Sequence, residues 1–281
     1  MDASGVKGSM ITAGWTDTHA HLADERLQSK LPSLLSESMV YGVRRILCVA
    51  VDADSLDTID GVYREWEQYD AAKPQIFQSV GIHPNYAQQE KPGDWEKICA
   101  KVSDLRVAAL GETGLDKHWD DCPFEVQLAN FRRHWVLSRQ TGLPVIIHSR
   151  DCDEPMLDLL REEYRNGPLK GVMHSFCSSY EVATECIAMG LYISFSGMLT
   201  YKKNDSLRQT ASRLPIDRLL VETDAPYLSP EPKRSARCNE PAFVAYTGRV
   251  LAGLHGQSES QMADATTSNA LRLFERMGPL V

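Results

Sequence analysis

Short apolar runs alternate along the chain with longer stretches of helical period. Apolar or β-rich runs begin near residues 15, 44, 75, 106, 144, 170, 191 and 218. In the clearest of them, 45–50, 144–148 and 218–222, apolar residues stand at consecutive positions. That pattern is typical of parallel strands that are covered on both faces. We therefore predict eight buried strands.

The segments between these runs carry apolar residues at helical spacing. This spacing predicts helices over 31–40, 124–139, 153–165, 178–189 and 204–213, and two closing helices over 241–254 and 260–274. Gly42, Gly142 and Gly190 stand where helices should stop and the chain should turn. Asn239 is expected to cap the first closing helix, with Pro241 in its opening turn.

Eight strands with intervening helices predict an α/β fold of the (β/α)8 TIM-barrel type. A doubly wound open sheet is the competing fold, but it usually carries a glycine-rich phosphate loop after its first strand, and the sequence shows none. We expect one barrel domain over 15–281, preceded by a flexible lead-in over 1–14.

Composition narrows the class of protein. The net charge of −8 argues against a broad basic surface for nucleic acid, although a metal site could still hold a single phosphodiester. Seven scattered cysteines without a CxxC pair indicate free thiols in a reducing compartment. We expect a cytoplasmic protein, with the nucleus as the alternative in a eukaryote. We expect no membrane association and infer no obligate protein partner.

Polar residues that can bind metal stand close to the predicted strand ends. A barrel of parallel strands gathers these ends into one pocket, so residues far apart in the sequence can meet there. In Asp17-Thr-His19-Ala-His21 the two histidines alternate and can face one ion. The candidate metal ligands are His19, His21, Glu112, His148, His174 and Asp224.

Three residues are candidates for catalysis. Glu112 can bridge two cations and lower their repulsion, with glycines on either side that let the backbone approach. Asp224 can ligate a metal and accept a proton from its water. His83 is expected to contact phosphate rather than metal. Glu222 is expected only to brace its neighbours.

Basic residues near the strand ends are candidates to hold the phosphate oxygens of a substrate. They are Arg150, Lys202 and Arg237, with His83 beside them.

At these residues the chain resembles the TatD family of metal-dependent deoxyribonucleases, within the amidohydrolase-like barrels. The matching stretches are 16–22, 80–84, 111–116, 143–150, 173–176, 194–197, 221–228, 239–241 and 267–274. The resemblance implies two divalent ions (Mg²⁺, Mn²⁺ or Zn²⁺), one held by His19, His21, Glu112 and Asp224 and the other by Glu112, His148 and His174. It also implies 3′–5′ exonuclease activity on DNA, with single strands or 3′ ends as substrate and a role in DNA repair or fragmentation.

Two other classes of function compete with this hypothesis. The same Lewis-acid chemistry could hydrolyse a carboxylic ester or amide, as in an aminoacyl-tRNA deacylase. A non-catalytic binding protein could also use a barrel scaffold. The complete set of ligand residues argues against the latter, because a degenerate site should have lost at least one of them.

Overall fold

The computed structural model describes residues 14–236 and 238–278, and its strands form one sheet. Within these residues the sheet has eight strands in chain order, each parallel to its neighbours. They are β1 (Trp15–Ala20), β2 (Val43–Cys48), β3 (Gln75–Val80), β4 (Val107–Asp116), β5 (Val145–Arg150), β6 (Gly171–Met173), β7 (Tyr192–Phe195) and β8 (Leu219–Val221). The predicted (β/α)8 barrel is confirmed.

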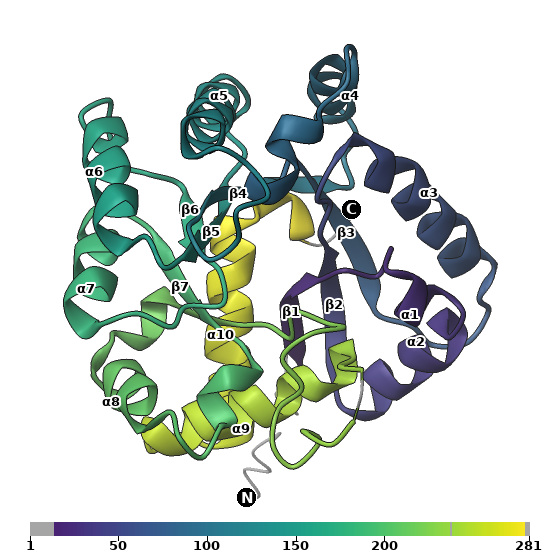
Figure 1. Ribbon diagram of the computed structural model, residues 1–281. Coiled ribbons are helices and arrows are strands. Elements are labelled where there is room, and N and C mark those ends of the chain that lie inside the picture. The colour runs from purple at the N-terminus through teal and green to yellow at the C-terminus, as the bar shows by residue number, and fades with distance from the viewer. Residues whose placement is uncertain (1–13, 237, 279–281) are drawn as a thin grey trace, which may run out of the picture.

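Helices follow the strands and surround them (Figure 1). The α-helices are α1 (Glu25–Gln28), α2 (Leu31–Val40), α3 (Ala53–Gln68), α4 (Asp94–Lys101), α5 (Phe124–Thr141), α6 (Asp153–Tyr164), α7 (Tyr180–Ala188), α8 (Asp205–Arg213), α9 (Val244–Leu254) and α10 (Glu259–Leu273). Short 3₁₀ helices are η1 (Pro84–Gln89), η2 (Gly197–Thr200), η3 (Ile216–Arg218), η4 (Pro241–Phe243) and η5 (Glu275–Met277). The predicted helices are present, and most of their ends differ from the predicted ones by at most two residues. The exception is the first closing helix, whose predicted start at 241 forms the 3₁₀ helix η4, so that α9 begins at Val244. The three turn glycines all have positive φ, as their positions predicted.

The prediction that Asn239 caps the first closing helix is wrong. Glu240 precedes the opening 3₁₀ turn, and its side chain makes no capping bond. The buried Asn239 amide instead donates to the carbonyls of Thr223 and Tyr227, at 2.9 and 2.6 Å. These two carbonyls of the loop after β8 need a donor, and satisfying them outweighs capping a helix end.

Two apolar layers hold the barrel together. One lies between the strands and the outer helices, and it includes Phe131 and Trp135 of α5. The other fills the barrel interior, where Phe77 of β3 packs with Phe274 and Met277 from the end of the chain. The segment formed by α10 and η5 therefore contributes to the barrel interior, and α10 lies within the ring of helices in Figure 1.

The first and last strands are joined mainly at the end where both finish. Asp224 N–H donates to the carbonyl of His19 at 2.9 Å, and His21 N–H donates to the carbonyl of Ala225 at 2.7 Å. Lower down, the Thr18 hydroxyl donates to the carbonyl of Val221 at 3.0 Å. Closure of the barrel therefore brings the first motif of the chain against the motif that follows β8.

One strand is longer than its apolar run indicated. Glu112 was expected to follow the fourth strand, but it lies inside β4, which continues to Asp116. Gly114 makes this continuation possible, because a Cβ there would lie 2.0 Å from the carbonyl oxygen of His148. The close approach of the two backbones sets Glu112 beside β5.

The expected lead-in over 1–14 lies outside the described residues except for Gly14. Among the described helices, none is both long and apolar enough to cross a membrane.

Candidate metal centre

The six candidate metal ligands and His83 meet at the carboxyl end of the barrel. His19, Glu112 and His148 lie within β1, β4 and β5, and the rest lie on the loops that follow β1, β3, β6 and β8. Their side chains are buried or nearly so; the most exposed, that of His148, retains 15% of its accessible surface. Strands whose ends gather at one edge therefore bring together residues from position 19 to position 224.

A first ligand group faces one oxygen of Glu112. The Nε2 atoms of His19 and His21 are 3.2 Å apart, and Glu112 Oε2 lies 3.3 and 3.8 Å from them. Asp224 Oδ1 lies 3.7 and 3.3 Å from the same two nitrogens. Ligands held about 2.0–2.1 Å from a tetrahedral ion lie about 3.3–3.4 Å from one another. The distances of His19 and His21 Nε2 from each other and from the two carboxylate oxygens are close to this spacing.

A second ligand group faces the other oxygen of the same carboxylate. His148 Nδ1 lies 2.8 Å from Glu112 Oε1, and His174 Nε2 lies 3.0 Å from it. Glu112 thus presents each of its oxygens to a different pair of imidazoles.

His83 lies beside the second group. Its Nε2 is 3.6 Å from Glu112 Oε1, and the donor atoms of His83, Glu112 and His148 all lie within 4.8 Å of one another. The other ring nitrogen, Nδ1, accepts a hydrogen bond from Asn85 N–H at 3.2 Å. In the neutral ring this places the proton on Nε2, which then points toward the centre as a donor. That tautomer suits a phosphate contact better than metal ligation.

Carboxylates outside the two groups hold the imidazoles of the second group. Glu222 Oε1 lies 2.9 Å from His174 Nδ1 and also accepts from Ser175 N–H at 2.7 Å. Asp116 Oδ2 lies 3.0 Å from His148 Nε2. Such a contact fixes the tautomer and the orientation of a ligating imidazole and raises its basicity. The position of Glu222 agrees with the bracing role that the sequence indicated.

Two buried aspartates of the centre, Asp116 and Asp17, are not among the residues predicted from the sequence. Asp17 accepts from Thr223 through the backbone N–H at 2.9 Å and the hydroxyl at 2.6 Å, which holds β1 against the loop that carries Asp224. A signal was available for both, because Asp17 stands two residues before His19 and Asp116 four residues after Glu112. At such spacings side chains share one face of a strand.

The charges of the centre favour an anionic Glu112 next to a protonated His174. Burial raises the pKa of Glu112, but nearby histidines, His174 foremost, outweigh it and hold that pKa well below its usual range. Burial lowers the pKa of His174, but Glu112 and Glu222 raise it well above its ordinary value. Burial lowers the pKa of His83 to about 3. Cations that bind here must displace protons from imidazole nitrogens.

The backbone is strained at the same end of the barrel. Among the described residues, the non-glycine positions with positive φ are Asp151, Ser175, Asp224 and Leu228, on the loops after β5, β6 and β8. Each such conformation costs about 1–3 kcal/mol and persists only where its surroundings impose it. Two of these residues are Asp224 itself, with φ of 58°, and the neighbour of His174, with φ of 44°.

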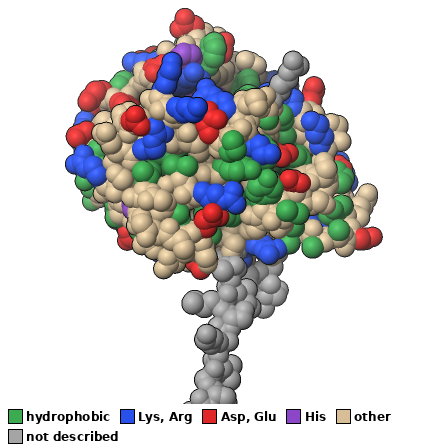
Figure 2. All heavy atoms as spheres, turned by 90° about the horizontal axis from the view of Figure 1, so that it is seen from below, with side chains coloured by type: hydrophobic (Ala, Val, Ile, Leu, Met, Phe, Trp, Pro, Cys, Tyr) green, Lys and Arg blue, Asp and Glu red, His purple; other side chains and the backbone are tan. Residues whose placement is uncertain are grey.

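Two of the basic residues predicted to contact phosphate, Arg150 and Lys202, lie at or beyond the carboxyl ends of strands. Arg150 ends β5 with an exposed side chain, and its guanidinium lies 5.7 Å from the centroid of the Trp119 ring. Lys202 is exposed between η2 and α8. Arg237 lies outside the described residues. On the face shown in Figure 2, basic and acidic side chains are interspersed with apolar ones, so this face offers no broad basic surface.

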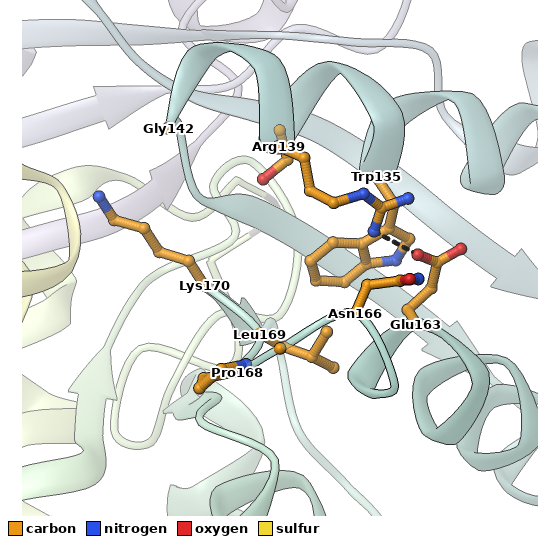
Figure 3. Close-up of a pocket in the computed structure, with 10 residues that line it drawn as sticks. Trp135, Arg139, Gly142, Glu163, Asn166, Pro168, Leu169 and Lys170 are labelled. Atoms are coloured by element: carbon orange, nitrogen blue, oxygen red, sulfur yellow. Dashed lines mark hydrogen bonds and ion pairs between the residues drawn. The ribbon is translucent and has the colours of Figure 1, made fainter.

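Two pockets differ in their relation to the centre. One of about 240 Å³ borders His174 and is lined by Ser149, Cys152, Met173 and Phe176, among others. Another of about 160 Å³ lies between α5 and the connection from α6 to β6, where Arg139 pairs with Glu163 (Figure 3). None of the described residues that line this second pocket belongs to the centre. Of these two pockets, only the one beside His174 is lined by a residue of the centre.

Comparison with known proteins agrees with the geometry. The model of the family described as TatD related DNase matches residues 16–275. A protein of Bacillus subtilis named as the uncharacterised metal-dependent hydrolase YabD is 38% identical over 92% of this chain and 98% of its own length. The 3′-5′ ssDNA/RNA exonuclease TatD of Yersinia pseudotuberculosis is 28% identical over 92% and 98%. The crystal structure of a TatD homologue from Escherichia coli superimposes with a TM-score of 0.83 at 25% identity, covering 93% of this chain and 98% of the other.

Proposed function

This chain belongs to the TatD-related DNase family of metal-dependent hydrolases, and we propose that it removes nucleotides from the 3′ end of single-stranded DNA. The observation that carries the proposal is Glu112, whose two oxygens face two separate sets of ligand atoms. A carboxylate bridging two cations is suited to a reaction in which both the attacking and the leaving oxygen need stabilisation.

The donor set fits two divalent ions. His19, His21, Glu112 and Asp224 would hold one of them. Glu112, His148 and His174 would hold the other. Imidazole with carboxylate suits zinc, manganese or iron, and magnesium prefers more oxygen ligands. Bound at these positions, the ions would supply Lewis-acid stabilisation of charge on a phosphoryl oxygen and would make water more acidic.

The protein itself would move the proton and hold the phosphate. Asp224 is anionic at neutral pH, because nearby histidines, His21 first, outweigh burial and lower its pKa. Its carboxylate would accept the proton of the attacking water. His83 would donate from Nε2 to a phosphate oxygen as a neutral ring. Arg150 and Lys202 would neutralise the following phosphates of the strand.

The substrate is proposed from the family and from one relative. The Yersinia pseudotuberculosis protein named as a 3′-5′ ssDNA/RNA exonuclease aligns over 92% of this chain. The pocket of about 240 Å³ beside His174 offers room for part of a nucleotide next to the second ligand group.

The test uses metal-stripped protein and single-stranded DNA. Magnesium, manganese or zinc is added back separately, and strands labelled at the 5′ end report stepwise shortening from the 3′ end. Glu112→Ala is the matched control. Ion-dependent shortening that is absent in the control supports the proposal and identifies the working ion. If folded, metal-loaded protein cleaves no strand but hydrolyses carboxylic esters or amides such as aminoacyl-tRNA, the proposed substrate is wrong.

A further inference from the structure

Three large aromatic side chains are exposed around the carboxyl end of the barrel. Tyr86 in η1, Trp119 after β4 and Tyr227 after β8 retain 41%, 50% and 49% of their accessible surface. Rings of this size are usually at least partly covered, because each can bury roughly 150–250 Å². Tyr164 is similarly exposed at 43%, but it ends α6 on the side where the chain enters β6. We call the first three side chains the stacking rim.

Two members of the stacking rim are attached to the centre in the same way. The backbone N–H of Tyr86 donates to the carbonyl of His83 at 3.0 Å, and that of Tyr227 donates to the carbonyl of Asp224 at 2.8 Å. Each ring therefore stands one tight turn beyond a residue of the centre. The Tyr86 ring lies 5.7 Å from that of His83 between centroids.

The third member is attached through a side chain of the centre. The backbone N–H of Trp119 donates to Asp116 Oδ1 at 3.2 Å, and the other oxygen of the same carboxylate contacts His148 Nε2 at 3.0 Å. One carboxylate thus fixes both a candidate metal ligand and the loop that carries the indole.

Cations without carboxylate partners lie at or beyond the carboxyl ends of β4, β5 and β7. Among the described residues, Lys117, Arg150 and Lys202 take part in no ion pair within 4.0 Å, although the chain as a whole is acidic. Arg150 instead faces the Trp119 ring, at 5.7 Å from its centroid. An aromatic face beside an unpaired cation is the combination that holds a base together with its phosphate.

We propose that the stacking rim seats the unpaired bases of a single strand while the phosphates between them reach the metal centre. The inference rests on the proposed function and adds how the strand is held. A duplex keeps its base faces stacked on one another, so only a single strand can offer them to Trp119 and its partners. Every base has such a face, so this mode of binding predicts preference for single strands with little preference for sequence.

The experiment measures binding separately from cleavage. The metal-loaded full chain is titrated into a fluorescent single strand with phosphorothioate linkages, and anisotropy reports the Kd. A second strand carries abasic sites at its 3′ end and keeps every phosphate. The variants are Trp119→Ala and Tyr86→Ala, with Trp119→Phe as the conservative replacement and Tyr164→Ala as the matched exposed control.

Trp119→Ala should weaken binding of the normal strand roughly 5- to 150-fold, the range that one stacked base supports. Trp119→Phe should restore most of the affinity, and Tyr164→Ala should bind like the wild type. The abasic strand should bind the wild type weakly and lose little further in Trp119→Ala. Equal binding of both strands by the wild type, or unchanged affinity in Trp119→Ala, would overturn the stacking rim. If Trp119→Ala weakens binding but the wild type cleaves no DNA, the stacking rim is supported and the proposed nuclease activity is refuted.

Discussion

The two ligand groups of the centre meet at one carboxylate, yet they are built differently. In the second group, the ring nitrogens of His148 and His174 that face away from Glu112 contact Asp116 and Glu222. In the first group, Nδ1 of His19 is buried and has no hydrogen-bond partner among the described residues. The second group is oriented by carboxylates, and the first by its position on β1 and by closure of the barrel.

This difference predicts which substitutions should weaken ion binding at each group. A braced imidazole keeps its tautomer and orientation even without a cation, so its bracing residue can be removed separately from the ligand. Closure bonds such as that from Asp224 N–H to the carbonyl of His19 hold the first group, and no single side chain accounts for it. The two proposed metal sites should therefore differ in which substitutions weaken them.

Loss of the carboxylate that both groups share should weaken ion binding at both of them. Glu112→Gln removes the charge that both groups face, so we expect neither ion to bind firmly and turnover to fall on the order of a thousandfold or more. Metal content per chain, measured by elemental mass spectrometry, and nuclease rate would be compared with the wild type. Two firmly bound ions in a folded Glu112→Gln protein would show that the carboxylate does not bridge them.

Loss of the proposed base should separate the groups. Asp224→Asn should lower turnover roughly 10²- to 10⁴-fold, the usual contribution of a general base, while the second group keeps its ion. The measurements are turnover at saturating metal and metal content after dialysis. Near-normal turnover would exclude Asp224 as the proton acceptor.

Replacing Glu222, which contacts His174, should weaken ion binding at the second group only. Glu222→Gln should weaken ion binding at the second group about 10- to 100-fold, because the amide can still accept a hydrogen bond but lacks the negative charge. The first group should be unchanged. Competition with a metal-sensitive dye would resolve the two affinities. Glu185→Gln, which breaks only a surface pair with Arg161, is the control. Equal weakening of both ions would contradict the separation of the groups.

A histidine outside both groups gives the smallest expected effect. His134 in α5 contacts the carbonyl of Asn130 through Nδ1 at 2.7 Å and accepts from Ile82 N–H through Nε2 at 3.2 Å. Burial lowers its pKa to about 3. This folded-state pKa lies below the unfolded value near 6.5, so the unfolded chain binds the extra proton between them. Its stabilising effect is present above pH 6.5 and declines as pH falls toward 3.

The measurement is the free energy of unfolding in urea at pH 7.5 and at pH 5.5. The wild type should lose about 1.4 kcal/mol more than His134→Gln on moving to the lower pH, since one pH unit below the unfolded pKa is crossed. The variant itself should be less stable at pH 7.5, because the buried N–H of Ile82 keeps only a poorer acceptor. An identical pH dependence in both proteins would show that His134 is not the group responsible.

Much of this architecture could be predicted from the sequence, and the misses have identifiable causes. Consecutive apolar residues located the strands, because burial on both faces is a local requirement. Glu112 was placed after its strand rather than within it, since Gly111 to Asp116 carries polar residues and glycines that mask a strand. Asn239 has the residue type and position of a helix cap, and only the fold reveals the loop carbonyls that it serves instead.

The sequence by itself determined the order of strands and helices and the chemical types of the candidate ligands, because hydrophobic periodicity and side-chain chemistry are local properties. The tertiary structure decided which oxygen of Glu112 faces which imidazoles, that Asp116 and Glu222 brace the second group, and that Trp119 stands beside it. These relations depend on barrel closure and on the register of neighbouring strands. Both arise from packing between residues distant in the chain, and they set distances of a few ångströms that no local pattern encodes.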